Sequence, residues 1–304
     1  MSDSCHCGAE PSVFLHYSQK HMCSEHFMMM FDKRVRKTVR EFKMLKKGDR
    51  VAVGLSGGKD SIVVLHSLAS IAKSLPMELV AITIDEGIKG YRERTLRIAK
   101  AECEKLGVEH VVFSYEKSAG KTMDSIVAAN PDEIPCANCG VLRRYLLNRG
   151  AREVRADKLA TGHNLDDLAQ TVMMNIMRAE PSRLARFSDP IIKSERFIPR
   201  IRPLLRTPEK EVAIYALLRG IELESVECPY ARFAFRGHVR KMLNEAEEKY
   251  PGTKFKIVNS FLDMEGALRA KYADEASLPP CDSCGEPSSQ KTCMFCQKVR
   301  LINK

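Results

Sequence analysis

Hydrophobic residues follow two periods that alternate along this chain. Short apolar runs predict buried strands at 51–55, 79–84, 108–113 and 158–161. Apolar residues at helical spacing predict helices at 27–47, 62–72, 91–106, 208–219 and about 236–248, with a further helix beginning at Leu168. Strands and helices that alternate with short connections favour an α/β fold, in which helices cover both faces of a doubly wound parallel sheet.

The turn after the first strand carries the strongest chemical signal. It reads Ser56, Gly57, Gly58, Lys59, Asp60, Ser61 and leads directly into a helix. Backbone N–H groups converge there with the positive end of the helix dipole, and the glycines let a phosphate approach the backbone. The lysine adds a cation, the serines add hydroxyl donors, and Asp60 can hold a Mg²⁺ that bridges to phosphate oxygens.

This turn lacks the spacing of a Walker A loop, G-x-x-x-x-G-K-[ST]. It matches instead the pyrophosphate loop of enzymes that activate a carbonyl or amide oxygen as an adenylate. A tight turn with an incidental lysine is the weaker interpretation, since six consecutive residues fit the pattern. The turn therefore predicts an ATP site.

A second loop is expected at the same edge of the sheet, after the strand at 158–161. It contains Gly162, Asn164, Asp166 and Asp167. Asn164 or Asp166 can cap the following helix, while two carboxylates beside a glycine fit a nucleotide and metal site. Ligands of such sheets lie at the carboxyl ends of the strands, so the backbone near Ile84 is a candidate adenine contact.

Cysteines gather at both ends of the chain. Cys5, Cys7, Cys23 and His26 form a C-x-C…C-x-x-H pattern that suits a tetrahedral zinc ion. The tight first pair makes Cys5 the least certain ligand, with His6, His16 and His21 as competitors, and reactive free thiols are a weaker alternative. At the other end, a double C-x-x-C predicts a zinc ribbon with the ligands Cys281, Cys284, Cys293 and Cys296.

Four cysteines remain after these two sites. Cys103 lies in a predicted helix and is expected to be a buried hydrophobe. Cys136 and Cys139 form a C-x-x-C pair before a basic helix, and Cys228 stands alone. The pair by itself leaves a redox dithiol, half of a zinc site and an iron-sulfur site open.

Composition points to a soluble protein with an anionic partner. The net charge is +10 and the pI is near 9.0, which favours nucleic acid. Arginines are concentrated in one stretch where they outnumber lysines, at positions 178, 183, 186, 196, 200, 202 and 206, which suits bidentate phosphate contacts. The sequence has no membrane-span or signal-peptide pattern, so we expect a cytoplasmic location without membrane partners.

In this combination and order, the motifs resemble those of the tRNA 2-thiolation enzymes of the TtuA and cytoplasmic tRNA 2-thiolation protein 1 group. The similarity spans the N-terminal cysteine module, S-G-G-K-D-S, C-x-x-C-G, T-G-H-N-x-D-D, E-C-P and the terminal double C-x-x-C. The stretches 173–184 and 227–237 are similar to the wobble-uridine branch rather than to the T-loop branch. The resemblance implies a pyrophosphate-loop fold of the adenine nucleotide alpha hydrolase-like type, flanked by zinc modules.

The resemblance also implies a reaction. An ATP-dependent enzyme would adenylate the uracil C2 oxygen and then replace it with sulfur. Cys136, Cys139 and Cys228 would hold a [4Fe-4S] cluster through three irons, and the fourth iron would bind hydrosulfide. The cofactors would be ATP, Mg²⁺, this cluster and two Zn²⁺, and the catalytic residues Asp60, Asp167 and Arg143.

Residue by residue, the resemblance implies ATP contacts for Gly54, Ser56, Gly57, Gly58, Lys59, Asp60, Ser61, Ile84, Arg143, Gly162 and Asp167. Relatives often carry a lysine at the position of Arg143, for which we expect a purely electrostatic role because arginine stays charged. The partners would be tRNA, a sulfur donor (sulfide or a ubiquitin-like thiocarboxylate protein) and a second copy in a homodimer.

This interpretation divides the chain into four segments: an N-terminal zinc module at 1–30, the ATPase domain at 31–225, a helical tRNA-binding extension at 226–275 and a zinc ribbon at 276–304. Three alternatives stay open: thiolation of the T-loop uridine, persulfide-based transfer without a cluster, and a non-catalytic zinc and RNA-binding protein.

Overall fold

The computed structural model describes residues 4–185, 196–223, 227–230, 235–272 and 279–302. Its strands are β1 Val13–Leu15, β2 Lys20–Met22, β3 Arg50–Gly54, β4 Glu78–Asp85, β5 Glu109–Ser114, β6 Lys158–Ala160 and β7 Arg200–Ile201. Its helices are α1 Ser24–Glu41, α2 Lys59–Ala72, α3 Arg92–Leu106, α4 Tyr115–Ala119, α5 Met123–Ala129, α6 Pro135–Glu153, α7 Leu165–Met177, α8 Pro181–Leu184, α9 Glu209–Leu218, α10 Arg236–Lys249, α11 Thr253–Tyr272 and α12 Met294–Ile302.

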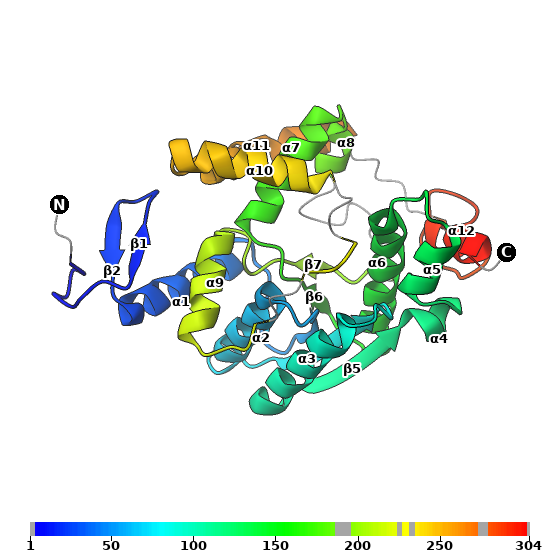
Figure 1. The fold of residues 1–304 in the computed structure, drawn as a ribbon, viewed down its shortest axis with the longest axis horizontal. Helices are drawn as coiled ribbons and strands as arrows, with labels where there is room; N and C mark the ends of the chain where they lie inside the picture. The colour runs from blue at the N-terminus through cyan, green and yellow to red at the C-terminus, as the bar shows by residue number, and fades with distance from the viewer. Residues whose placement is uncertain (1–3, 186–195, 224–226, 231–234, 273–278, 303–304) are drawn as a thin grey trace.

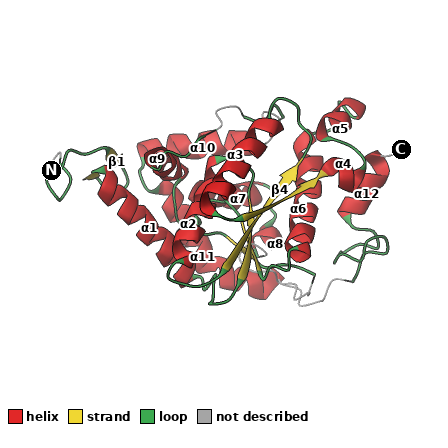
Figure 2. Ribbon diagram, turned by 90° about the horizontal axis from the view of Figure 1, so that it is seen from below, coloured by secondary structure: helices red, strands yellow, loops and turns green. Residues whose placement is uncertain are grey.

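A five-stranded parallel sheet forms the centre of the molecule, in the order β5-β4-β3-β6-β7. Figure 2 shows helices on both sides of its strands. Strands β4 and β5 extend the sheet on one side of β3. The chain then crosses over and adds β6 and β7 on the other side of β3. The loops after β3 and β6 therefore meet at a topological switch point, where sheets of this type bind ligands. The predicted doubly wound α/β fold is confirmed.

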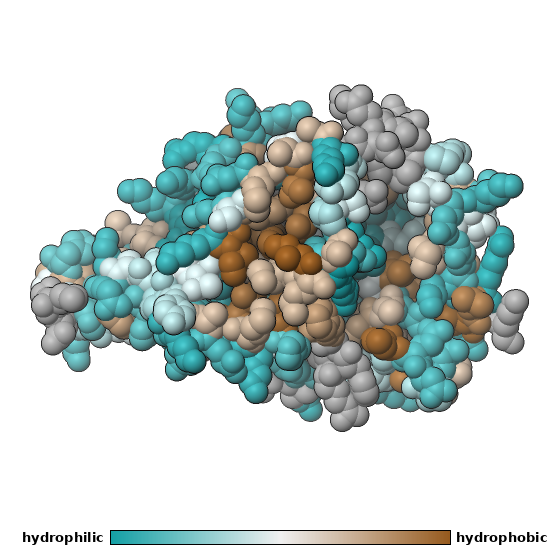
Figure 3. Space-filling model, turned by 90° about the horizontal axis from the view of Figure 1, so that it is seen from above, coloured by the Kyte–Doolittle hydropathy of each residue, from teal (hydrophilic) through white to brown (hydrophobic). Residues whose placement is uncertain are grey.

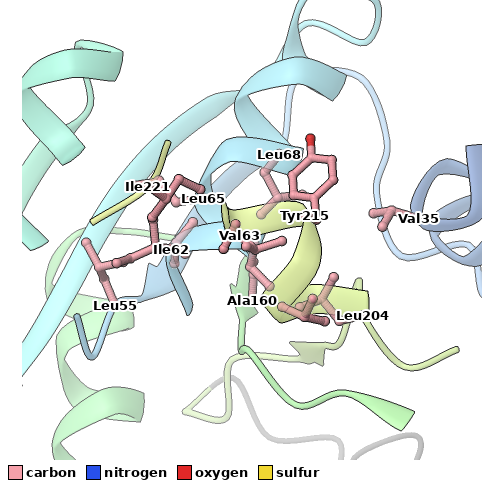
Figure 4. Packing of buried hydrophobic residues seen from close by; sticks show 14 of the residues in the cluster. Val35, Leu55, Ile62, Val63, Leu65, Leu68, Ala160, Leu204, Tyr215 and Ile221 are labelled. Carbon is pink, nitrogen blue, oxygen red and sulfur yellow. The ribbon is translucent and has the colours of Figure 1, made fainter. Parts of the chain in front are cut away.

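Alternation along the strands explains the two layers. Val51 and Val53 of β3 pack into one hydrophobic cluster with α1, α2 and α9, while Ala52 between them belongs to a second cluster with α5, α6 and α12. Successive side chains of a strand point to opposite faces, so an all-apolar strand needs cover on both. Figure 4 shows the first cluster, in which Leu68 of α2 lies near Tyr215 of α9.

The two cysteine modules lie at opposite ends of the long axis (Figure 1). The N-terminal module contains the antiparallel pair β1–β2 and leads into α1. The C-terminal module packs on α6, where Phe295 stacks on Tyr145 with ring centroids 3.6 Å apart. Glu286 pairs there with Arg152, and Lys298 donates to Glu133 at 3.3 Å.

A third hydrophobic cluster joins α7 and α8 to α10 and α11. Viewed from above, apolar surface gathers in the middle of the face over these helices (Figure 3). Exposed apolar side chains on α7 and α11 include Ile176, Met177 and Met264. None of the described helices is long and apolar enough to cross a membrane.

The predicted helix boundaries that were wrong include the end of the first helix and the start of the helix after β6. The first helix ends at Glu41 rather than at position 47, because Lys43 adopts a left-handed conformation (φ 47°) and the Met44 N–H bonds back to the Val39 carbonyl. The helix expected to begin at Leu168 begins at Leu165. The segment boundaries near positions 30, 225 and 275 stay predictions, and Arg186 lies outside the described residues.

Candidate active site and metal centres

A cavity of about 290 Å³ lies at the switch point of the sheet. Of the predicted ATP contacts, Gly54, Ser56, Asp60, Ser61, Ile84, Arg143, Gly162 and Asp167 line it. Its other polar lining residues are Glu86, Arg92, Thr161 and His163, none of which was a predicted ATP contact. The structure thus brings residues from β3, β4, α6 and the loop after β6 around one space.

Two glycines let the loops at the cavity pack closely against neighbouring helices. Gly57 has a φ of +81°, and a Cβ on it would lie 2.1 Å from the Thr95 carbonyl oxygen. A Cβ on Gly162 would lie 2.9 Å from the Ser61 nitrogen. A side chain on Gly57 would clash with α3, and one on Gly162 would push the loop after β6 away from the N-terminus of α2, so both glycines set the shape of the cavity.

Lys59 points away from this cavity. Its ammonium group lies 3.1 Å from Asp60 and 2.8 Å from Glu209 at the start of α9, and its side chain lines a separate cavity of about 630 Å³. Although burial opposes the charge, the two carboxylates raise the pKa of Lys59. The lysine is therefore charged and held by carboxylates, and it has to turn to reach a phosphate.

Replacement of Glu209 by glutamine is expected to strengthen ATP binding. The variant removes a carboxylate that competes with phosphate for Lys59, and a partly exposed pair of this kind is worth up to about 1 kcal/mol. We expect up to about fivefold higher ATP affinity, measured by equilibrium dialysis. Glu222→Gln, which breaks an exposed pair with Arg97, is the control and should leave ATP affinity unchanged; weaker binding in Glu209→Gln would contradict the competition.

The adjacent carboxylates Asp166 and Asp167 have separate roles. Asn164 caps α7 in a capping box, in which its side chain accepts the Asp167 N–H and Asp167 accepts the Asn164 N–H. Burial raises the pKa of Asp167 to about 6, and the neighbouring Asp60 adds to the effect. Asp166 does not line the cavity; it accepts from the Lys254 ammonium and from the Glu209 N–H.

Asp60 and Asp167 are the carboxylates best placed for a metal ion beside phosphates. Both line the cavity, and Asp60 accepts a hydrogen bond from Asn164 at 2.9 Å. Hard carboxylate oxygens next to a phosphate site suit Mg²⁺. The third titratable group of this loop, His163, is uncharged, because burial and then the arginines Arg202 and Arg236 lower its pKa to about 3.

Cys136, Cys139 and Cys228 face one another beside this cavity. Cys136 and Cys139 occupy the first turns of α6, which begins at Pro135, and each of the three thiols interacts electrostatically with the other two. Tyr115 donates to the Cys139 carbonyl at 2.8 Å and lies 3.5 Å from its Sγ. Burial raises the pKa of all three thiols.

The spacing of these thiols is wider than a single ion requires. In the described part of the chain, ligand atoms within 4.8 Å of one another form two groups of three or more, and neither contains these cysteines. Thiolates that bind different irons of one cluster lie further apart than thiolates on one ion. An all-thiol, partly buried donor set of this kind therefore fits an iron-sulfur cluster better than zinc.

Arg143 connects the cysteines to the nucleotide cavity. It follows Cys139 by four positions on α6 and lines the cavity. Burial opposes its charge, yet Cys139, Glu86 and Tyr115 together raise its pKa. One permanent positive charge is thus shared between the thiol site and the space for ATP.

The two terminal groups fit single metal ions. Cys5, Cys7, Cys23 and His26 lie within 4.8 Å of one another, as do Cys281, Cys284, Cys293 and Cys296. The Cys23 and Cys5 Sγ atoms lie 3.3 Å and 3.4 Å from His26 Nδ1. Tetrahedral sulfur ligands about 2.3 Å from an ion are about 3.8 Å apart, and the Cys284 and Cys293 sulfurs are 3.6 Å apart. Cys5 is part of the first group; His6 is near but outside it.

Comparisons with known proteins cover nearly the whole chain. Residues 28–247 match the PP-loop domain family. The chain is 37% identical to the tRNA 2-thiolation protein NcsA of Haloferax volcanii, over 97% of this chain and 98% of that protein. It is 35% identical to the tRNA-5-methyluridine(54) 2-sulfurtransferase of Pyrococcus horikoshii, over 96% and 91%.

A solved structure shows the same fold along the entire length. The U34-tRNA thiolase NcsA from Methanococcus maripaludis, determined with its [4Fe-4S] cluster, superposes with a TM-score of 0.85. It is 35% identical and covers 99% of this chain, which in turn covers 97% of it. The likeness extends through both terminal cysteine modules as well as the sheet.

Proposed function

The chain belongs to the PP-loop tRNA 2-thiolation enzymes, and on that premise we propose that it thiolates the wobble uridine of tRNA at C2 in an ATP-dependent reaction. The observation that carries the proposal is the position of Arg143. Its guanidinium belongs both to the nucleotide cavity and to the surroundings of Cys136, Cys139 and Cys228. A site that activates an oxygen therefore adjoins a site that can deliver sulfur.

In the first step, the uracil C2 oxygen attacks the α-phosphorus of ATP, the bond from that phosphorus to the β-phosphate breaks, and pyrophosphate leaves as N3 loses its proton. The pyrophosphate loop holds the phosphates through the N–H groups at the start of α2 and the hydroxyls of Ser56 and Ser61. Asp60 and Asp167 would hold Mg²⁺, which would neutralise charge on the phosphates. Arg143 stabilises the charge that develops on the α-phosphate.

In the second step, hydrosulfide attacks C2, the C2–O bond breaks with AMP as the leaving group, and the hydrosulfide proton restores N3–H. A [4Fe-4S] cluster held by Cys136, Cys139 and Cys228 would supply an open iron that binds hydrosulfide as a Lewis acid. Tyr115 holds Cys139 in place through its hydrogen bond to the Cys139 carbonyl. Arg143 keeps a positive charge between the thiol site and the nucleotide cavity.

Two observations support the wobble position. The superposition with a U34-tRNA thiolase covers 99% of this chain, and the 173–184 and 227–237 stretches are similar to the wobble branch. We further propose zinc in both terminal groups, and sulfide or a thiocarboxylate protein as the sulfur donor.

Anaerobic single turnover tests the function. Reconstituted protein is mixed with ATP, sulfide and unmodified tRNA, the tRNA is cut by a nuclease, and 2-thiouridine is located by fragment mass spectrometry. Thiouridine in the anticodon fragment supports the proposal. Thiouridine in the T-loop fragment would assign the chain to the other branch, and product from protein that holds zinc but no iron would favour persulfide transfer. tRNA binding without ATP-dependent product would indicate a non-catalytic protein.

Arg143→Lys distinguishes an electrostatic role from bidentate binding. Lysine keeps the charge, so we expect thiolation within about tenfold of wild type, whereas Arg143→Gln should lose about 100-fold or more. ATP affinity is measured in parallel. If the lysine variant thiolates faster than wild type at unchanged ATP affinity, a group that can give up a proton is useful at this position. The purely electrostatic role would then be wrong.

A further inference from the structure

Glu86 is a carboxylate of the nucleotide cavity that has no part in either of the two reaction steps described above. It follows β4 directly, is buried (5% exposed), and lines the cavity together with Asp60, Asp167 and His163. Of these proton acceptors, the two aspartates are assigned to Mg²⁺, and a pKa of about 3 makes His163 a weak base. Among the described lining residues, Glu86 is therefore the remaining candidate for a base that acts on the substrate.

The position of Glu86 relates it to the thiol site as well as to the nucleotide cavity. Its charge acts on the Cys139 and Cys228 thiols and on the Arg143 guanidinium. In the proposed reaction, uracil C2 has to be reached by the α-phosphorus through O2 and by sulfur directly, and N3 is bonded to C2. A carboxylate that faces both the nucleotide cavity and the thiols is thus near the place where N3 has to lie.

Arg92 holds one oxygen of Glu86 and leaves the other available. The Arg92 Nε atom lies 2.9 Å from Glu86 Oε2, and no hydrogen bond within the described residues occupies Oε1. The same guanidinium donates to the carbonyl oxygens of Ser56 and Ile84, so Arg92 is itself fixed to the ends of two strands. A carboxylate on such a support keeps its position when a substrate approaches its second oxygen.

We propose that Glu86 is the base that accepts the N3 proton of the target uracil. The proposal rests on the proposed function, because it assigns a residue to a step of that reaction. As O2 bonds to the α-phosphorus, the N3–H bond breaks, its electron pair forms the C2=N3 double bond, and the proton moves to the Glu86 carboxylate. The new bond at O2 makes N3–H more acidic, so a carboxylate is a sufficient base. In the second step the hydrosulfide proton restores N3–H, and Glu86 releases its own proton to water.

Glu86→Gln tests this role, because glutamine keeps the shape of the side chain and cannot take up the proton. Anaerobic single turnover measures the rate of 2-thiouridine formation from ATP, sulfide and unmodified tRNA, and equilibrium dialysis measures ATP affinity. We expect thiolation to fall about 100-fold or more, with the iron content of wild type and little change in ATP affinity. Thiolation at the wild-type rate would overturn the proposal. Equal losses of ATP affinity and thiolation would also overturn it, because Glu86 would then act only by holding Arg92.

Glu86→Ala with added formate separates a base from a structural support. Alanine leaves room for a small carboxylate, and formate should raise the thiolation rate of this variant about tenfold or more. Formate should not accelerate wild type, and chloride at the same ionic strength should have no effect on the variant.

A more acidic substrate provides an independent measurement. tRNA transcribed with 5-fluorouridine carries an N3–H that is easier to remove, so the defect of Glu86→Gln relative to wild type should shrink by about tenfold with this tRNA. If neither formate nor 5-fluorouridine reduces the defect, Glu86 is a structural residue and its assignment as the base is wrong.

Glu102→Gln is the matched control. Glu102 is buried to a similar extent (7% exposed) and pairs with His66 at 2.6 Å, but it does not line the nucleotide cavity. This variant should lose stability on thermal unfolding and keep its thiolation rate. If both variants lost thiolation equally, general destabilisation would explain the effect and the proposal would fail.

Failure of the proposed function gives a different result. If wild type forms no 2-thiouridine, the reaction is wrong and the role of Glu86 is wrong with it. If wild type thiolates tRNA and Glu86→Gln does so at the same rate, only the role of Glu86 is wrong.

Discussion

Cys228→Ala is expected to abolish 2-thiouridine formation while ATP binding persists. Cys228 interacts with Cys136 and Cys139, but it does not line the nucleotide cavity. Loss of one of three protein thiolates should cost at least about 100-fold in product, since groups that merely orient metal ligands are already worth about 10–100-fold. Iron and acid-labile sulfide per chain, the absorbance of the cluster and single-turnover product are measured anaerobically.

Cys103→Ala is the control for this variant. Cys103 is buried in α3 as a small hydrophobe, as predicted, and burial raises the pKa of its thiol to about 12. Its replacement should keep iron content and product. If Cys228→Ala retains product at wild-type yield, Cys228 is structural, and sulfur must reach the uridine by another route.

Asp167→Asn is expected to stabilise the nucleotide-free fold and to lower thiolation about 100-fold or more. Burial raises the pKa of Asp167 from 3.8 to about 6, and each unit corresponds to about 1.4 kcal/mol. Because the folded state binds this proton more tightly than the unfolded state, the stability falls as the pH rises from about 4 to about 6. At pH 7 the ionised carboxylate therefore lowers the free energy of unfolding by about 3 kcal/mol. Asparagine regains this stability and still accepts the Asn164 N–H.

Asp166→Asn is the matched control one residue away. It leaves the Lys254 ammonium, which is buried, without its carboxylate partner, so we expect a loss of about 3–5 kcal/mol. Urea unfolding at pH 5 and pH 7 separates the two: the gain in Asp167→Asn should be larger at pH 7 than at pH 5. A destabilised Asp167→Asn at pH 7 would show that the carboxylate contributes to stability rather than being kept at a cost.

The sequence predicted the sheet and the surroundings of the nucleotide cavity because both depend on local patterns. Apolar runs that lead into glycine turns place the loops after β3 and β6, and parallel pairing brings these loops together. Pro135 was an available signal that the C-x-x-C pair begins a helix rather than precedes one, since proline is favoured in the first helical turn.

Long-range pairing could not be predicted from local patterns. The partner of Lys59 is Glu209, 150 positions away, and the partner of Asp166 is Lys254, 88 positions away. Nothing in the local sequence says which of two adjacent aspartates points into the cavity. Met44 misled the helix prediction because it is buried and fits the helical period, although it lies beyond a left-handed residue.

The packing of the C-terminal module on α6 sets an order on how the protein matures. Phe295, Glu286 and Lys298 follow Cys136 by 150 to 162 positions, yet they contact Tyr145 and Arg152 of α6 and Glu133 just before it. A ribosome makes these contacts available only after α6 has been synthesised. Until the C-terminal module has folded, the face of α6 that Phe295 and Glu286 cover lacks its packing partner, so the helix that presents two of the three central thiols should reach its final packing only when this module is in place.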